Sequence, residues 1–450
     1  DRIEDAFELT LRDNPLPGTI GRICHFHCQM RCRRDMLDEP VAQGEVHRYL
    51  ADTMYKLGNE ERIYKKLLDE KLPSTGKRIA IVGAGPAGLT AAFYLLRLGH
   101  DVTIYDAFEK PGGVLRYGIP QYRLPHQVLD KETELIARLG ARFEMGKRLG
   151  TDFRLHELKG DFDAVYLAFG AWKELPLNIP GEEAEGVFPG TELLRQLSEG
   201  RLPEMGRRVA VVGAGNVAID AARSLWRYGK EVTIVYRRDK CSMPANHSEI
   251  AESEAEQIQF RFMSAPVEVL VNAAGRVRGL KIELMTCGGI DASGRRKPIA
   301  TGKFDRLDCD AVVVAIGEGV DNSIVDEIST GRSGTVEINA FTGQTNLPKV
   351  FAGGDAVTGP STAAEAMGMA KKAAASIDEY LMGQKRFDRL FRRFVYRNTI
   401  PPHPVKTPKN VSYKLAVKDR NRNFLEVDGG YTGLQARAEV NRCLRCDVHL

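Results

Sequence analysis

The chain has 450 residues, 43% of them hydrophobic, and a formal net charge of +4. This length allows about three domains with substantial cores, and the small net charge argues against nucleic-acid binding through bulk electrostatics. No apolar run reaches about 18 residues, so we expect neither a membrane span nor a secretory leader. Eight cysteines do not make a disulfide scaffold, and we expect a reducing, cytoplasmic location.

The N-terminal segment, residues 1–73, is polar and has helical stretches such as 45–70. It contains Cys24, Cys28 and Cys32 in GRICHFHCQMRC, a C-x₃-C-x₃-C run. Thiolates in a reducing compartment suit an iron–sulfur cluster or zinc. The residues alone do not distinguish an iron–sulfur cluster from zinc.

A duplicated unit follows the linker LPSTGK. Residues 78–106 and 208–236 align without a gap at an offset of 130 residues. Each copy has a short apolar run, a glycine-rich turn, an amphipathic stretch and a second β-rich run. This order predicts two βαβ units, each opening a parallel sheet.

The glycine spacing of each turn has a physical reason. The first glycine permits the tight turn, the second lets a pyrophosphate approach, and the third small residue lets the helix pack closely. The pyrophosphate then binds free N–H groups at the helix N-terminus. The small residues are Gly83, Gly85 and Gly88 in the first copy and Gly213, Gly215 and Ala218 in the second. Two turns that bind nothing are the alternative, which two complete motifs in one chain disfavour.

The two copies differ at the end of their second strand. Asp106 ends the first unit, as expected for a carboxylate that accepts hydrogen bonds from a free ribose, such as that of FAD. The second unit has Tyr236, Arg237 and Arg238 there. Guanidinium groups pair with a 2′-phosphate, so we expect NADP(H). An ordinary solvated strand end is the alternative for the two arginines.

Later segments continue both units. AVYLAFGAW (164–172) and AVVVAIGEG (311–319) predict buried strands that lead into glycine turns. A strand, a GGD turn and a helix are expected in 350–381, where Thr362 and Glu365 have capping-box spacing. The chain then becomes rich in Arg, Pro and Lys.

Cys443 and Cys446 form CLRC near the C-terminal end. Zinc remains an alternative to a cluster here, because C-x₂-C pairs often bind it. A redox-active pair is a third interpretation, although the pair is far in sequence from the flavin motifs. Cys241, Cys287 and Cys309 are isolated, and we expect ordinary buried cysteines.

The order of these segments resembles the flavoproteins with two dinucleotide-binding domains. EKPGGVLRYGIPQYRLP (109–125), YRRDKCSMPA (236–245) and GDAVTGPSTAAEAMGMA (354–370) resemble more closely the small, NADPH-oxidising subunit of glutamate synthase. The N-terminal half of dihydropyrimidine dehydrogenase and the large subunit of ferredoxin-dependent transhydrogenases are similar. The resemblance implies FAD, NADP(H) and one or two 4Fe–4S clusters.

This resemblance also implies the architecture. We expect an α/β fold of two Rossmann-like domains, with the NADP domain inserted in a discontinuous FAD domain and a small helical iron–sulfur domain at the N-terminus. The expected parts are 1–73 (iron–sulfur), 74–185 (FAD, first part), 186–318 (NAD(P)H), 319–385 (FAD, second part) and 386–450 (extension with cluster ligands).

The motifs and the resemblance together indicate the nucleotide contacts. In the family, the acid of the late GD motif contacts the ribityl chain, and the next helix points its N-terminus at the flavin. The expected nucleotide-binding residues are Gly83, Gly85, Pro86, Ala87, Gly88, Asp106, Gly113, Arg116, Gly213, Gly215, Asn216, Val217, Arg237, Arg238, Gly317, Gly354, Asp355, Thr362 and Ala363.

The cluster ligands depart from the family pattern. Two 4Fe–4S clusters need eight ligands, and the cysteines near the two ends of the sequence supply only five. Either one cluster forms, or other ligands complete two. The resemblance places a non-cysteine ligand at His47, where relatives carry Glu or Gln and some others carry a cysteine at the place of Gly44. A surface histidine is the alternative. Under the ligand interpretation, one cluster takes Cys24, Cys28 and His47, and a second takes Cys32, Cys443 and Cys446.

The expected function is an NADPH-oxidising or NADP-reducing flavoprotein subunit that exchanges single electrons with a partner. We expect no catalytic side chain, because the cofactors carry the chemistry. The expected partner is a redox subunit or a ferredoxin-like acceptor in a hetero-oligomeric complex. A disulfide reductase of the same fold would need a cysteine pair near a flavin motif. A non-catalytic structural subunit would not need intact nucleotide motifs.

Overall fold

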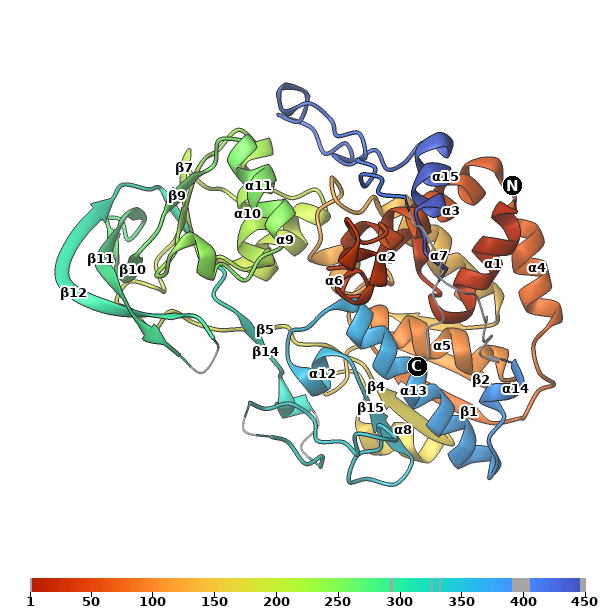
Figure 1. The fold of residues 1–450 in the computed structure, drawn as a ribbon. Helices are drawn as coiled ribbons and strands as arrows, with labels where there is room; N and C mark the ends of the chain where they lie inside the picture. Colours follow the sequence, from red (N-terminus) through yellow and green to blue (C-terminus); the bar gives the residue numbers. More distant parts are fainter. Residues whose placement is uncertain (1, 292–293, 325–326, 332, 391–404, 446–450) are drawn as a thin grey trace.

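The structure is a computed structural model that describes residues 2–291, 294–324, 327–331, 333–390 and 405–445. The predicted α/β fold with two parallel sheets is confirmed, and Figure 1 shows the sheets in separate halves of the molecule. Within these described ranges, no helix has both the length and the apolar character needed to cross a membrane.

The first parallel sheet has the strand order β15-β4-β1-β2-β3. Its strands are β1 (Arg78–Val82), β2 (Asp101–Asp106), β3 (Arg142–Met145), β4 (Ala164–Leu167) and β15 (Val350–Ala352). Apolar residues fill both faces of the central strand, as in sheets covered on both sides. The helices α5 (Pro86–Arg97) and α13 (Ala363–Met382) pack against each other. Since β15 comes from beyond the second duplicated unit, this sheet combines two distant segments of the chain.

The second parallel sheet repeats this plan with the order β6-β13-β7-β8-β9. Its strands are β6 (Val187–Pro189), β7 (Arg208–Val212), β8 (Glu231–Val235), β9 (Gln259–Arg261) and β13 (Ala311–Val314). Its helices are α9 (Gly190–Ser198), α10 (Asn216–Arg227) and α11 (His247–Ala255). Val82 pairs with Tyr105 in the first sheet, as Val212 pairs with Val235 in the second, so the duplication extends to strand register.

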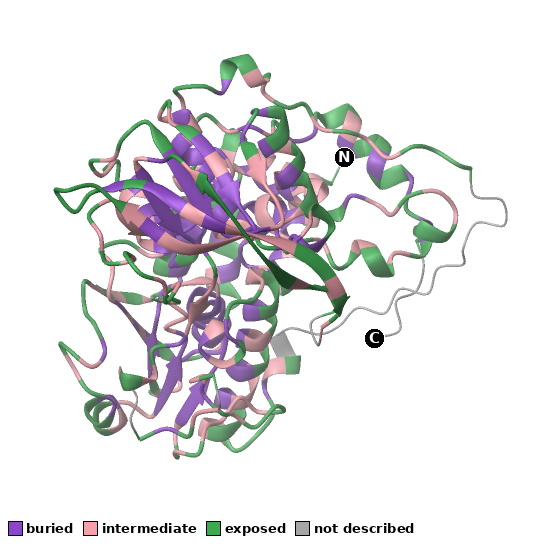
Figure 2. Cartoon of the chain, turned by 90° about the vertical axis from the view of Figure 1, so that its left-hand side faces the viewer, coloured by how far each residue is buried: buried purple, intermediate pink, exposed green. Residues whose placement is uncertain are grey.

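An antiparallel sheet extends the second half, and the sequence reasoning did not predict it. It consists of β10 (Ser264–Val271), β11 (Val277–Ile290) and β12 (Arg296–Leu307). Figure 2 shows buried strands in both parallel sheets, whereas β12 is almost wholly exposed. The short strands β5 (Lys173–Glu174) and β14 (Glu318–Gly319) pair where the chain crosses between the two halves.

The N-terminal helices pack on the first half. They are α1 (Ile3–Asp13), α2 (Pro17–Ile23), α3 (Gln43–Leu57) and α4 (Glu60–Asp69), with the 3₁₀ turns η1 (Gln29–Arg31) and η2 (Arg33–Met36). Phe7 and Leu11 share one apolar core with Ile79 and Ile81 of the sheet. Near the other end, η5 (Val417–Asp419) precedes α15 (Gly433–Asn441), which contacts α3 of the N-terminal segment (Figure 1).

Shorter elements complete the connections. They are α6 (Val114–Tyr117), α7 (His126–Arg138), α8 (Leu155–Asp161), α12 (Asp355–Thr358), α14 (Phe387–Leu390), η3 (Lys240–Ser242) and η4 (Asn322–Ile324).

Candidate functional site

Bare backbone surrounds the N-terminus of α5. A Cβ added to Gly113 would lie 2.8 Å from the Cα of Gly85, and one on Gly354 would lie 3.0 Å from the Cβ of Ala87. Three segments, from β1–α5, the loop before α6 and the loop after β15, therefore meet at this helix without intervening side chains. Such a cradle fits a nucleotide pyrophosphate, which binds the free N–H groups of a helix N-terminus.

The same turn geometry occurs in both halves. Gly83 has φ +110° and Gly213 has φ +132°. An added Cβ would collide with the carbonyl oxygen of Ala168 in the first turn and of Ala315 in the second. Gly215 has no atom within 4 Å of an added Cβ among the described residues, so the space above the second turn is open. At Gly83 and at Gly213 a side chain would collide with the backbone, so both turns require glycine, as the sequence predicts.

Asp106 supports the first turn with its own carboxylate. Its Oδ2 accepts the N–H of Ala84 at 2.6 Å, and its Oδ1 accepts the N–H of Phe108 at 2.8 Å. Burial raises the pKa of this carboxyl group, and the two backbone N–H groups oppose that rise. The predicted ribose contact stays a prediction. The structure adds that Asp106 also holds the glycine turn in place.

The two arginines after β8 lie in different surroundings. Arg237 is exposed. Arg238 is buried, pairs with Asp291 at 2.7 Å and donates to the carbonyl oxygen of Arg296 at 3.0 Å. Asp291 lies in the connection between β11 and β12, and Arg296 is the first residue of β12. The sequence pattern RR could not distinguish the two side chains, because the contacts of Arg238 are distant in sequence.

The GGDA segment lies beside the first turn. Asp355 begins α12, and burial raises its pKa to about 6. The predicted capping box is confirmed, with the Glu365 N–H donating to the Thr362 hydroxyl at 3.2 Å and the Thr362 N–H donating to Glu365 at 3.3 Å. Ala366 lies near Gly354, so the start of α13 is close to the cradle at α5.

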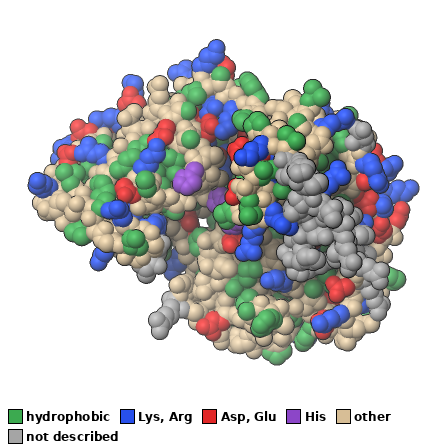
Figure 3. Space-filling model, viewed as in Figure 1, with side chains coloured by type: hydrophobic (Ala, Val, Ile, Leu, Met, Phe, Trp, Pro, Cys, Tyr) green, Lys and Arg blue, Asp and Glu red, His purple; other side chains and the backbone are tan. Residues whose placement is uncertain are grey.

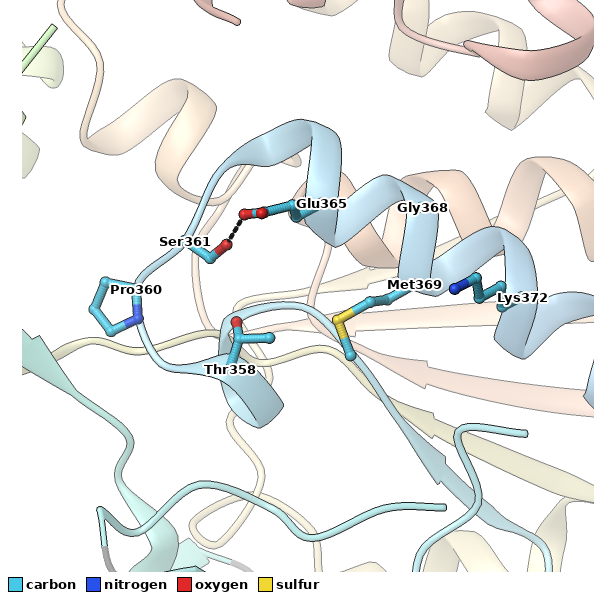
Figure 4. Close-up of a pocket in the computed structure, with 7 residues that line it drawn as sticks. All are labelled: Thr358, Pro360, Ser361, Glu365, Gly368, Met369 and Lys372. Atoms are coloured by element: carbon cyan, nitrogen blue, oxygen red, sulfur yellow. Dashed lines mark hydrogen bonds between the residues drawn. The ribbon is translucent and has the colours of Figure 1, made fainter. Parts of the chain in front are cut away.

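A surface cavity of about 560 Å³ opens between the α12–α13 loop and α13 (Figure 4). Its lining residues are Thr358, Pro360, Ser361, Glu365, Gly368, Met369 and Lys372. Ser361 donates to Glu365 across the start of the helix. No motif in the sequence indicated this cavity. Its residues follow the GGDA motif along the exposed face of α13.

The other predicted nucleotide residues lie at the same helix ends. Pro86, Asn216 and Ala363 begin α5, α10 and α13, Val217 follows Asn216, and Gly317 has φ +141° after β13.

Arg116 is buried within its own loop. Its Nε donates to the carbonyl oxygen of Pro111 at 2.6 Å, and its guanidinium pairs with Asp130. Its predicted nucleotide contact stays a prediction.

The N-terminal cysteines lie close enough to influence one another. The pKa of Cys28 is raised chiefly by burial and further by the neighbouring Cys24 and Cys32 thiols. The Cys24 sulfur accepts the N–H of Phe26 at 3.2 Å. Backbone N–H groups directed at clustered soft thiols fit an iron–sulfur centre. In the described part of the chain, however, no three His, Cys, Asp or Glu side chains are already gathered as a metal site.

His47 is half-buried on α3, and burial lowers its pKa. The ring of Phe26 occupies the space where Gly44 would carry a Cβ. A cysteine at position 44, as in some family members, would therefore collide with Phe26 in this chain.

Buried arginines bring Cys443 to the N-terminal segment. Arg442 pairs with Glu439 at 2.6 Å and donates to the carbonyl oxygen of Glu39 at 2.7 Å. Arg34, two residues after Cys32, donates to the carbonyl oxygen of Arg442. The second cysteine of the pair, Cys446, lies outside the described residues.

The cysteine run also reaches both nucleotide-binding halves. The His25 Nε2 lies 3.5 Å from the side-chain Nδ2 of Asn216, at the start of α10. Glu365, at the start of α13, contributes to the electrostatic environment of His25 and His27. Figure 3 shows histidine side chains at the hollow between the two halves. The segment of Cys24 and Cys28 therefore lies near both helix N-termini.

One expectation about the remaining cysteines is wrong. Cys309 is buried as expected, but Cys241 and Cys287 are exposed. They belong to η3 and to the outer part of β11, whose residues around Cys287 are exposed or half-buried. The Cys287 sulfur lies 3.9 Å from the Asp239 carboxylate.

Two parallel-sheet nucleotide folds, one inserted between segments of the other, define a flavoprotein oxidoreductase of the two-dinucleotide class. The family model described as pyridine nucleotide-disulphide oxidoreductase matches residues 77–370, and this chain belongs to that family. A second model, dihydropyrimidine dehydrogenase domain II with a 4Fe–4S cluster, matches residues 1–59. The chain is thus an NAD(P)H-dependent flavoprotein oxidoreductase with FAD and a 4Fe–4S domain, as predicted.

Two curated relatives are similar over two thirds or more of their own length. The NADP(+)-dependent formate dehydrogenase subunit beta of Moorella thermoacetica is 37% identical, over 99% of this chain and 67% of the relative. The glutamate synthase (NADPH) small chain of Escherichia coli is 34% identical over 84% of each protein. The predicted resemblance to the glutamate synthase small subunit is confirmed.

Solved structures share the fold. Mycobacterium tuberculosis FprA in complex with NADPH has a TM-score of 0.57 at 24% identity, over 68% of this chain and 84% of that chain. Thioredoxin reductase of T. acidophilum has a TM-score of 0.52 at 22% identity, over 67% of this chain and 98% of that chain.

Proposed function

We propose that this chain oxidises NADPH and passes single electrons to a partner subunit. The observation that carries this proposal is the position of the Cys24–Cys28 segment. It touches the start of the NADP-side helix through His25 and Asn216, and it lies near Glu365 at the start of the flavin-side helix. A cluster held there would be adjacent to both nucleotide sites, which suits short-range electron transfer.

The chain's own residues then bind and orient. When bound, FAD and the iron–sulfur cluster supply the conversion between hydride transfer and single-electron transfer. The glycine turns at α5 and α10 present N–H groups to the two pyrophosphates. Asp355 and the start of α13 face the flavin in the proposed arrangement, and the positive end of that helix favours negative charge there. Arg237 is exposed at the strand end and is proposed to pair with the 2′-phosphate.

The proposed cluster ligands lie in two groups. Cys24, Cys28 and His47 form the first, and Cys32, Cys443 and Cys446 form the second. The bond from Arg34 to the Arg442 carbonyl supports the second group, because it brings Cys443, the next residue after Arg442, toward the residues that follow Cys32. The predicted division of the chain at about residues 73, 185, 318 and 385 is retained as part of the proposal.

The names of two relatives support the proposal of a partner subunit. Those of Moorella thermoacetica and Geobacter sulfurreducens are both called beta subunits, the latter of an NADPH-Fe(3+) oxidoreductase at 34% identity. We propose that the acceptor site of this protein also lies on another chain. A disulfide reductase is disfavoured, because the expected flavin segments 74–185 and 319–385 contain no cysteine.

Anaerobic titration of the purified full chain with NADPH tests the proposal. Oxidised protein should show flavin bands with a broad shoulder near roughly 400 nm from iron–sulfur charge transfer. NADPH should bleach both features, in amounts that match the measured FAD and iron. Flavin reduction that leaves all cluster absorbance intact would contradict electron transfer to the cluster, and zinc in place of iron would contradict the cluster itself.

A further inference from the structure

A cavity of about 410 Å³ lies beyond the end of β8, where the connection between β11 and β12 approaches the second parallel sheet. Asp239 and Ser242 line one side, and Gly289, Arg295 and Arg296 line the other. The two walls are therefore distant in sequence. In a fold of this class, the strand end after the second unit is where the adenosine ribose of a dinucleotide lies.

The cavity has a basic character. Arg295 and Arg296 line it, and the exposed Arg237 lies on the strand end beside it. Asp239 is the acid on this wall, and one of its oxygens accepts the N–H of Ser242 at 3.0 Å. A dianionic group would meet several guanidinium groups here, which favours a phosphate over a neutral hydroxyl.

The tip of the β11–β12 hairpin, meaning its described residues Asp291, Gly294, Arg295 and Arg296, is joined to the end of β8 by direct contacts. Asp291 pairs with the buried Arg238 at 2.7 Å, and Arg238 donates to the carbonyl oxygen of Arg296 at 3.0 Å. Tyr236 donates its hydroxyl to the carbonyl oxygen of Ser242 at 2.8 Å. Burial raises the pKa of Tyr236, and the nearby Arg295 and Arg238 guanidinium groups oppose that rise. Arg295 is therefore close to the strand end as well as to the cavity.

We propose that the β11–β12 tip is the second wall of the subsite for the 2′-phosphate of NADP(H), with Arg295 as a phosphate-binding side chain opposite Arg237. Asp291 is a positioning residue, because its ion pair holds Arg238 against the tip and thereby fixes the tip relative to β8. This inference rests on the proposed use of NADP(H) and adds a recognition element from outside the βαβ motif.

Two fragments of the nucleotide test this subsite. Adenosine 2′,5′-bisphosphate and 5′-AMP differ only in the 2′-phosphate, and neither can undergo hydride transfer. Calorimetric titration of the full chain with its cofactors retained should show that Arg295→Ala weakens binding of the bisphosphate by at least about tenfold, since one charge-assisted hydrogen bond is lost. Binding of 5′-AMP should be unchanged. Asp291→Asn should give a smaller loss of the same selectivity.

Arg278→Ala is the matched control, because Arg278 is an exposed arginine near the start of β11, away from the tip. It should bind both fragments as the unchanged protein does. If Arg295→Ala does not fold, Arg295→Lys decides: it keeps the charge but loses the forked donor geometry, and it should show an intermediate loss.

The outcomes separate this inference from the proposed function. If Arg237→Ala loses affinity for the bisphosphate while Arg295→Ala or Arg295→Lys does not, the hairpin has no part in recognition and the inference is overturned. If the unchanged protein itself binds both fragments equally, the proposed preference for NADP(H) fails.

Discussion

Side chains of one type have different surroundings at the nucleotide sites. Arg237 faces solvent at the end of β8, and its neighbour Arg238 is buried in an ion pair with Asp291. A carboxylate predicted to bind a ligand can also support the fold, as Asp106 does by holding the glycine turn. The local environment therefore decides which copy of a repeated residue can contact a ligand.

His47 provides a direct test of cluster ligation. Burial lowers its pKa, which favours the neutral imidazole that can bind iron. His47→Ala should lose or convert one cluster, and His47→Cys should keep the cluster but lower its potential, because histidine ligation raises the potential. Iron analysis and reduced-state EPR give the readout, with the exposed His156→Ala as the control. Full iron and an unaltered spectrum in His47→Ala would show that His47 is not a ligand.

Asp355 predicts a pH effect on the FAD-free protein. Its pKa rises from an ordinary value of 3.8 to about 6 on folding. The folded state therefore binds more protons than the unfolded state between these values, and this group lowers stability as the pH rises through that window. Asp355→Asn should remove that loss and raise the free energy of unfolding at pH 7 by on the order of 1 kcal/mol. Urea unfolding at pH 4.5, 5.5 and 7 measures it.

The exposed Asp161→Asn is the control for this comparison and should leave the pH profile unchanged. Parallel pH profiles for Asp355→Asn and the unchanged protein would show that the carboxyl group titrates normally in the folded chain.

At the scale of elements, α15 and the preceding segment carry Cys443 to the N-terminal helices. The Ala42 N–H donates to Glu439 at 2.8 Å, and Arg442 reaches back to Glu39. These contacts join residues about four hundred positions apart in the chain. Cluster assembly therefore depends on the docking of α15 as well as on the thiols themselves.

Cys443→Ser should lower bound iron while FAD stays at its usual amount, because the residue is distant in sequence from both glycine turns. Cys241→Ser is the matched control, since Cys241 is also exposed but lies in the other half of the molecule. Quantification of iron, zinc and flavin in the same preparations measures the effect. Unchanged iron, or a loss of zinc instead, would contradict the proposed cluster ligand.

At the scale of the whole molecule, a buried ionic cluster joins three parts of the chain. Arg123, from the loop before α7, pairs with Asp220 of α10 at 2.6 Å and lies 3.3 Å from Glu249 of α11. Arg420, from the C-terminal segment, pairs with Glu256 at 3.1 Å. The cluster holds the NADP-side helices against the flavin-side half. It thereby keeps the two glycine turns and the cysteine run in one arrangement.

Arg123→Ala should destabilise the protein by about 3–5 kcal/mol, because it leaves the buried Asp220 carboxylate without its cation. Asp220 already has its pKa raised to about 6 by burial, and the loss of Arg123 should raise that pKa further. Denaturant unfolding followed by the fluorescence of the two tryptophans, Trp172 and Trp226 of α10, measures the loss of stability. The control is Arg138→Ala, an exposed arginine paired with Glu61, which should cost less than about 1 kcal/mol. Equal losses for both variants would show that the cluster is not a structural joint.

Local patterns in the sequence determined the nucleotide-binding units. The turns at Gly83 and Gly213 follow from steric limits within a few residues, and the capping box of Thr362 and Glu365 follows from helix geometry. The family resemblance carried by the order of the motifs also implied the inserted arrangement, which the return of β15 to the first sheet bears out. The two turns and the capping box are predictable because the interactions that produce them are close in sequence.

Only the tertiary structure decided how distant segments meet. The pairing of Arg238 with Asp291, the docking of Arg442 against Glu39, and the place of His25 beside Asn216 have no local signature. These contacts form when packed elements bring polar groups into a buried space, where each charge needs a partner. A single sequence records the residue types that can pair but not which ones do, because that choice is made by the packing of the whole chain.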